Sequence, residues 1–131
     1  MTNSIHLPKI VIEGVPVTKK NSQQILRKSN GTPFIAPSRK YKQYEQDTMW
    51  QLSRFGHPSI DYPVNVRCLY YMPTRRAVDL VNLLEATCDI LVKAGILKDD
   101  NSNIIIGHDG SRVCYDKKNP RTEIFIESVK Q

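Results

Sequence analysis

The spacing of apolar residues predicts two amphipathic helices, and the clearer one follows Asp79. Residues suited to a buried face recur there every three or four positions: Leu80, Leu83, Leu84, Thr87, Leu91 and Ala94. The Asp79 carboxylate can accept from the free N–H groups of the first turn, and Gly95 can adopt the left-handed conformation that often closes a helix. The pattern therefore predicts a central helix over residues 79–94.

A second helical pattern starts after Pro37. Ser38 is a typical N-cap residue, and the positions at helical spacing behind it are Tyr41, Tyr44, Glu45, Thr48, Leu52 and Phe55. Trp50 and the tyrosines lie on or beside this stripe. We therefore expect them in the core rather than stacked on nucleic-acid bases.

Other segments have the alternation or the β-branched content of strands. Residues 64–72 alternate apolar with polar side chains, which predicts a strand with one buried face. Further strands are predicted at 5–12, 103–106, 111–115 and 122–129. Asn30-Gly31 is a strong hairpin signal, so 24–28 and 32–36 are expected to pair as an arm within the basic stretch 13–37. The expected fold is a single α/β (α+β) domain, residues 1–131, with a mixed four- to five-stranded sheet packed with two main helices.

Composition narrows the classes of function. The chain has 131 residues, of which 40% are hydrophobic, and no apolar run is long enough to span a bilayer. The N-terminus lacks a signal-peptide pattern, so we expect a cytoplasmic protein with no membrane partner. The three scattered cysteines fit neither a zinc site nor a disulfide framework, and Cys68 and Cys88 are expected to be core thiols.

Charge is divided unevenly along the chain. Residues 1–78 hold 12 Lys and Arg against 4 Asp and Glu (net +8), whereas residues 79–131 hold 7 against 9 (net −2). This division suggests a front half that binds a polyanion and a rear half that holds a metal; ordinary solubility charge is the alternative. Arg39, Lys40 and Lys42 crowd the start of the second helix, where the helix dipole disfavours cations unless a phosphate lies nearby.

The candidate chemistry lies around the central helix. Carboxylates crowd between Asp79 and Asp100, directly after Arg75-Arg76, and clustered carboxylate oxygens are the ligands that Mg²⁺ requires. Mg²⁺ with basic flanks indicates phosphate chemistry. The alternative is a solvated helix face with a capping aspartate. No Ser-His-Asp set or Gly-rich phosphate loop indicates another reaction, and no nucleotide cofactor is expected.

Several segments together resemble the RusA family of Holliday-junction resolvases, a group often carried by phages and prophages. In chain order they are 17–22 (VTKKNS), Arg75-Arg76, 79–84 (DLVNLL), 93–95 (KAG), Asp99-Asp100 and 109–112 (DGSR). The resemblance implies a homodimeric, Mg²⁺-dependent endonuclease that cuts four-way DNA junctions.

The resemblance also implies roles for particular residues. Asp79 and Asp100 would be the principal ligands of Mg²⁺, or of Mn²⁺ as an alternative ion. Apart from the resemblance, the residues of this stretch themselves suggest Glu85 as a further ligand and Asp99 as a helper, with Asn82 orienting them. Cations would hold the phosphates of branched DNA, the first two nearest the site: Arg75, Arg76, Lys19, Lys20, Arg39 and Lys40.

Two positions depart from the family pattern. Val81 stands where better-known members carry the second aspartate of Asp-Leu-Asp-Asn, and Glu85 stands where they carry a lysine. Either Glu85 replaces the missing carboxylate, or Val81 marks a decayed metal site. In the second case the chain would be a non-catalytic junction-binding protein, which is the rival interpretation. A small RNA-binding module is a third, against which the tyrosines follow helical spacing rather than forming an aromatic sheet surface.

Chain geometry suggests that the site is shared between subunits. A helix from Asp79 to Ala94 has ends roughly 22 Å apart, and the six steps from Ala94 to Asp100 reach about 20 Å when fully extended. Asp100 could therefore return to Asp79 of its own chain only with almost no slack. Antiparallel helices in a two-fold dimer would place Asp100 of one copy beside Asp79 of the other.

Overall fold

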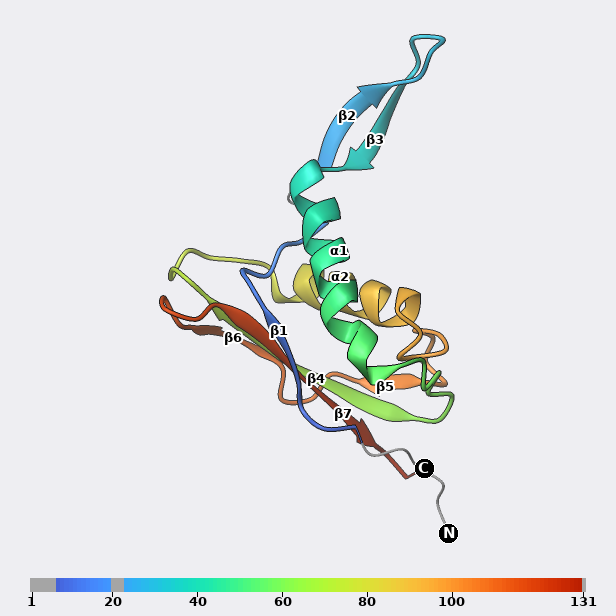
Figure 1. Ribbon diagram of the computed structural model, residues 1–131, viewed down its shortest axis with the longest axis vertical. Coiled ribbons are helices and arrows are strands. Elements are labelled where there is room, and N and C mark those ends of the chain that lie inside the picture. Colours follow the sequence, from blue (N-terminus) through green and yellow to red (C-terminus); the bar gives the residue numbers. More distant parts are fainter. Residues whose placement is uncertain (1–6, 20–22, 131) are drawn as a thin grey trace.

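A mixed five-stranded sheet forms one layer of the protein (Figure 1). The computed structural model describes residues 7–19 and 23–130. The strands of this sheet are β1 (Ile10–Glu13), β4 (Val64–Met72), β5 (Ile105–Gly107), β6 (Arg112–Tyr115) and β7 (Arg121–Ser128). β7 pairs antiparallel with both β1 and β4, whereas β5 and β6 pair parallel with the other edge of β4. The predicted fold class is confirmed.

β4 is the central strand of the sheet, with β7 on one edge and β5 and β6 on the other, and its side chains strictly alternate. Val64, Val66, Cys68, Tyr70 and Met72 are buried, and the residues between them are half-buried. Its pairing with β7 is continuous from Val64 opposite Ser128 to Tyr71 opposite Arg121. This long antiparallel ladder confirms the strand predicted at 64–72.

Side chains bridge the gap between β5 and β6 along the edge of β4. Asn65 binds the backbone of Asp109 through both ends of its amide, at 2.8 and 3.1 Å. The hydroxyl of Ser111 accepts from the N–H of Cys68 at 2.9 Å, and the His108 ring lies 2.9 Å from the Val66 carbonyl. Strand pairing therefore breaks here without leaving this edge unbonded.

Strand bounds at the chain's rear differ slightly from the predicted ones. The strand expected at 103–106 is β5, which begins at Ile105. The reason is a local turn, in which the carbonyl of Asn101 accepts from the N–H groups of Ile104 and Ile105. The first strand is observed from Ile10, and the residues before Leu7 lie outside the described part of the chain.

Both predicted helices are present with the predicted caps. In α1 (Arg39–Leu52) the Ser38 hydroxyl accepts from the N–H of Tyr41 at 3.1 Å. α2 (Leu80–Lys93) begins after Asp79, and a short 3₁₀ turn, η2 (Ser53–Phe55), follows α1. The two helices are linked by an ion pair of 3.0 Å between Lys93 and Glu45.

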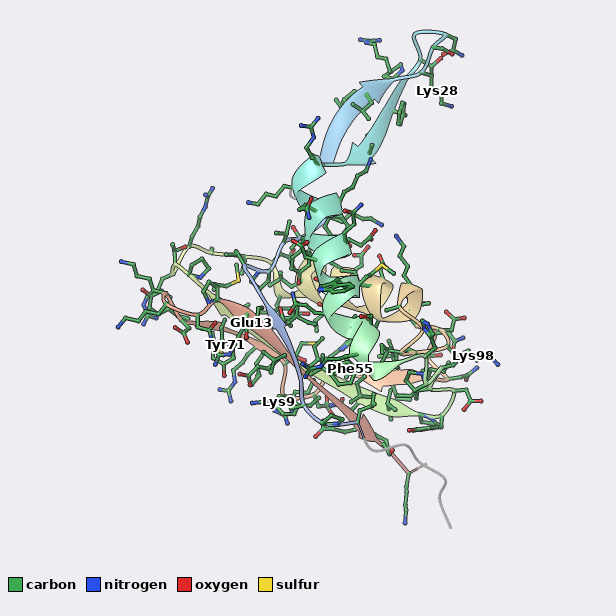
Figure 2. All side chains as sticks on the ribbon, in the orientation of Figure 1. Lys9, Glu13, Lys28, Phe55, Tyr71 and Lys98 are labelled. Carbon is green, nitrogen blue, oxygen red and sulfur yellow. The ribbon has the colours of Figure 1, made fainter. Side chains whose placement is uncertain are left out.

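The predicted hairpin arm is confirmed and stands apart from the rest of the structure (Figures 1 and 2). β2 (Gln23–Arg27) and β3 (Pro33–Pro37) pair antiparallel with each other as a separate two-stranded sheet. At the tip, Gly31 has φ +88°, a conformation that glycine adopts without strain, and the Asn30 side chain accepts from the N–H of Thr32.

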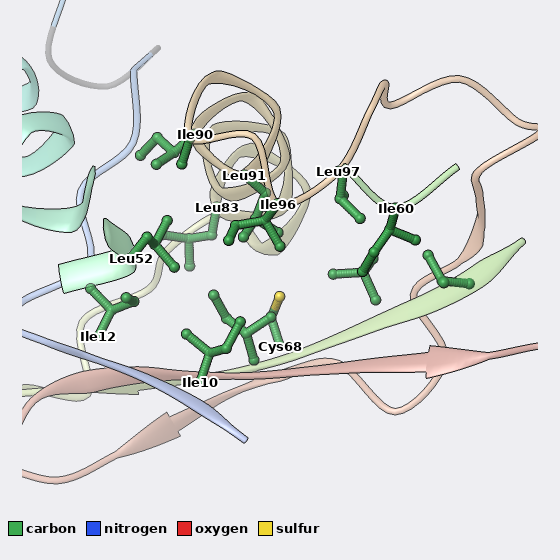
Figure 3. Close-up of a cluster of buried hydrophobic side chains, with 14 of the residues drawn as sticks. Ile10, Ile12, Leu52, Ile60, Cys68, Leu83, Ile90, Leu91, Ile96 and Leu97 are labelled. Atoms are coloured by element: carbon green, nitrogen blue, oxygen red, sulfur yellow. The ribbon is translucent and has the colours of Figure 1, made fainter. Parts of the chain in front are cut away.

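The core lies between the sheet and the two helices (Figure 3). Leu83, Ile90 and Leu91 of α2 face Ile10 and Cys68 of the sheet. Cys68 and Cys88 are both buried, as predicted, and burial raises the pKa of each thiol to about 12. Among the described residues, no helix is both long and apolar enough to cross a membrane.

The prediction that Trp50 lies in the core is wrong, since 79% of this side chain is exposed. Thr48 and Leu52 are buried on the inner face of α1. Trp50 lies two residues from each of them, which corresponds to about 200° around the helix. It therefore faces away from the sheet. The stripe prediction holds for Tyr41, which is fully buried, and for Tyr44, which packs against the core.

A buried hydroxyl pair offers a test of this core. The Thr87 hydroxyl donates to the Leu83 carbonyl at 2.9 Å, so the Tyr70 hydroxyl, at 2.6 Å, donates to Thr87. Thr87→Val should lower the free energy of unfolding by about 1–3 kcal/mol, because it buries an O–H without an acceptor, and Tyr70→Phe by about 1 kcal/mol. In urea unfolding, the double variant should be more stable than Thr87→Val alone. Additive losses would contradict this pairing.

Candidate active site

The candidate site is built on the outward face of α2. The residues on this face are spaced by one helical turn, so the side chains of Val81 and Glu85 lie above one another. Both are exposed, Val81 by 69%. Their orientation follows from burial of Leu83 and Leu91 on the opposite side.

A tight turn after α2 brings Asp100 back to this face. Gly95 has φ +75°, and a Cβ at this position would lie 2.6 Å from the His57 ring, so a larger residue is excluded. The chain then passes through the buried Ile96 and Leu97, and the N–H of Lys98 donates to the Ile60 carbonyl. This anchored return leads directly to the Asp99-Asp100 pair.

Glu85 and Asp100 line a common groove beside α2, which we call the α2 groove. Its lining residues are Val81, Leu84, Glu85, Cys88, Asp100, Ser102, Ile105, Ile106, Gly107 and His108. The chain geometry predicted that Asp100 could hardly return to Asp79 along α2, and the structure agrees with this in part. The chain returns as far as Val81 and Glu85, and Asp79 is outside the lining of the groove.

The other predicted site residues have local partners. The Asp79 carboxylate caps α2 by accepting from the N–H of Asn82 at 3.2 Å, as expected. Asp99 accepts from the N–H of Asp100 at 2.7 Å and from the Asn101 side chain at 3.1 Å. Over residues 7–19 and 23–130, no three Asp, Glu, His or Cys side chains are grouped so that they could hold a metal ion.

Asp89 is a carboxylate near the groove that the sequence reasoning did not select. Burial raises its pKa above the ordinary aspartate value, and the charges of Asp100 and Glu85 act in the same direction. The Lys19 ammonium opposes them from 3.8 Å. The sequence signal for Asp89 was its position four residues after Glu85, which places both on the same side of α2.

The six predicted DNA-contacting cations differ in their surroundings. Lys19 is paired with Asp89 and lies over the Tyr41 ring, and Lys20 is outside the described residues. Lys40, at the exposed start of α1, lines the same surface hollow as Arg76 from the loop before α2. Arg39 is exposed beside Lys40, and the Arg75 guanidinium stacks 4.5 Å from the centre of the Tyr115 ring. Of the five that the structure describes, Lys40 and Arg76 are brought together.

Comparison with known proteins finds matches over most of the chain. The family model described as "Endodeoxyribonuclease RusA" matches residues 13–127. The protein named "Crossover junction endodeoxyribonuclease RusA" from Aquifex aeolicus (strain VF5) is 31% identical over 94 residues, which cover 71% of this chain and 71% of that protein. The matched region of the family model includes the arm, both helices and the α2 groove.

The cap at Asp79 separates its structural role from any chemical one. Asp79→Ala should lower the free energy of unfolding by about 1 kcal/mol, because the first turn of α2 loses its acceptor. Asp79→Asn should cost only a few tenths of that value, since asparagine caps about as well as aspartate. Urea unfolding of both variants measures this difference. Equal losses would show that the carboxylate charge, rather than the cap, stabilises the helix.

Proposed function

Because the chain belongs to the RusA family of endodeoxyribonucleases, we propose that it resolves four-way DNA junctions at a metal site that a second copy of the chain completes. The observation that carries this proposal is the α2 groove, in which Glu85 and Asp100 lie together on an exposed surface. The family defines the reaction as cleavage of DNA. The metal, the dimer and the roles of single residues are the proposed parts.

The donor chemistry of the groove fits a hard divalent cation. Carboxylate oxygens are the ligands that Mg²⁺ prefers, with Mn²⁺ as an alternative ion, and Glu85 and Asp100 provide two such groups. A bound ion of this kind supplies an activated water and stabilises charge on the scissile phosphate. Asp99 positions Asp100 by accepting its N–H, and Asn82 lies in the first turn of α2, where its side chain would orient the ligands.

A second copy would supply what one groove lacks. In the described part of the chain no three carboxylates are grouped as a ligand set, and Asp79, at the N-terminal end of α2, lies outside the groove. The groove wall is also apolar at the exposed Val81 and the half-buried Leu84 and Ile105, a surface that a second copy would cover. Antiparallel α2 helices about a two-fold axis would bring each Asp79 to the other copy's Asp100.

Exposed cations would hold the DNA around this groove. Lys40 and Arg76 share one hollow, so a phosphate placed there would contact both, and no acidic residue lies in the first turn of α1 to repel it. Arg39 and Arg75 extend the surface on either side. Because these contacts are to the backbone, they provide affinity that falls with salt and carries no base sequence.

Val81 is the observation that favours a second candidate, a junction-binding protein without cleavage. It is 69% exposed in the groove, at a position where better-known relatives carry an acid. An aspartate here would project into the same groove as Glu85. The two candidates differ in one result, namely whether the wild-type chain cuts a junction in Mg²⁺.

The test of the function is cleavage of a labelled four-way junction, with duplex as the control. We expect wild-type cleavage in Mg²⁺, and a loss of more than about 100-fold for Asp100→Asn and for Glu85→Gln, because each removes a ligand charge. Binding should stay within about 2-fold, since the cations supply most of the affinity. Wild-type rates for Glu85→Gln would remove Glu85 from the site. An inert wild type that Val81→Asp activates would support the second candidate instead.

The test of the shared site uses hybrid dimers. Asp79→Asn subunits are mixed with Asp100→Asn subunits, and hybrids are purified through two different tags. In the shared arrangement each hybrid holds one doubly damaged site and one intact site, so single-strand nicking should reappear on a junction. Verified hybrids as inert as the parent variants would show that both aspartates act within one subunit.

A further inference from the structure

The β2–β3 arm presents apolar side chains that the rest of the protein leaves uncovered. Within the described residues its two strands pair only with each other, and the arm extends beyond the start of α1 (Figure 1). Ile25 lies opposite Ile35, and Leu26 lies opposite Phe34. Because successive side chains of a strand point to opposite faces, each face of the arm carries one apolar pair.

The isoleucine pair is the more exposed of the two. Ile25 and Ile35 are exposed by 74% and 67%, compared with 38% each for Leu26 and Phe34. An isolated hairpin of two strands is marginally stable in water, and neighbouring exposed β-branched pairs of this kind mark an interaction surface. The isoleucine face is therefore the surface of the arm best suited to contact a partner.

Charge identifies the chemistry of that partner. From Gly14 to Tyr44 the sequence contains no Asp or Glu and seven cations, which are Lys19, Lys20, Arg27, Lys28, Arg39, Lys40 and Lys42. Arg27 and Lys28 stand at the tip, where Figure 2 shows Lys28 projecting. Two such arms placed together would repel each other, whereas a polyanion gains from both.

We propose that the β2–β3 arm is a wedge that contacts nucleobases at the branch point of a DNA junction. The isoleucine face packs against bases that have lost a stacking partner, and Arg27 and Lys28 hold the adjacent phosphates. A ribbon of two strands fits a DNA groove, and apolar wedges between base steps are a common means of holding distorted DNA. Bases at a branch point cost least to unstack. This inference rests on the proposed function, since it needs a branched substrate.

The polarity of the isoleucine face can be tested with two variants that differ by one functional group at each residue. Ile25→Thr with Ile35→Thr keeps β-branched side chains that suit a strand, but places hydroxyls on the face. Ile25→Val with Ile35→Val has the same shape as the threonine variant but remains apolar, which makes it the matched control. Trp50→Gln is a second control, because it removes an exposed apolar side chain from α1 rather than from the arm.

The experiment places 2-aminopurine, whose fluorescence rises on unstacking, at the branch point of a junction without divalent ions. Wild type and the valine variant should raise the fluorescence, and Trp50→Gln should match wild type. The threonine variant should lose the rise and about 10-fold of junction affinity, while its affinity for linear duplex changes by less than about 2-fold. The same base placed in a duplex arm should stay quenched throughout.

Three results would overturn the wedge. One is a wild-type rise no larger at the branch point than in the duplex arm, a result that needs no variant. Another is equal behaviour of the threonine and valine variants. The third is a loss of dimer mass in light scattering for the threonine variant alone, which would make the arm a contact between copies. If wild type still cleaves junctions in these cases, the proposed function stands. If wild type neither binds nor cleaves junctions, both proposals fail together.

Discussion

The packing of α2 on β4 is the contact on which the arrangement of the acidic surface depends. Leu83, Ile90 and Leu91 are buried over the sheet, and this fixes the rotation of the helix about its own axis. Since a helix presents its other side to solvent, the same packing turns Val81 and Glu85 outward. The hydroxyl pair of Tyr70 and Thr87 adds direction to an otherwise apolar contact, because it forms in only one register. The outward position of Glu85 is thus a consequence of the core.

The second half of the groove depends on how the chain leaves α2. A helix that ended one residue later would carry the two aspartates away from the helix face by about 100° of rotation. Gly95 ends it at a fixed point, where the His57 ring leaves no room for a side chain. Ile96 and Leu97 then enter the core beside Ile60, so hydrophobic burial holds the loop before Asp100. A surface carboxylate is in this way positioned by buried residues that precede it.

Sequence patterns predicted the elements better than their assembly. The 3.6-residue period located both helices, alternation located β4, and Asn30-Gly31 located the arm, because each signal is local. The prediction for Trp50 was wrong because it used nearness to the apolar stripe in sequence and not the angular position of Trp50 around the helix. β5 began late because Asn101 makes a turn that competes with the strand. The carboxylates themselves could be identified from the sequence. Whether Asp79 and Asp100 meet depends on the turn at Gly95 and, in the proposed shared site, on a second copy, and neither leaves a periodic pattern in the sequence.

Under the proposed function, an acidic groove that admits DNA faces an electrostatic conflict, and the charge division along the chain would address it. Phosphates are repelled by Glu85 and Asp100 unless a divalent cation lies between them. Lys19 pairs with Asp89, which offsets one negative charge in the neighbourhood, and Glu85 and Asp100 are the two carboxylates that line the groove itself. The exposed cations on the arm, and Lys40 and Arg76, do not line the α2 groove, so under the proposed function they would attract the DNA backbone from outside it. Basic residues at the groove itself would compete with the metal of the proposed site for the same carboxylates, so under the proposed function this separation would let one small domain bind both DNA and a metal ion.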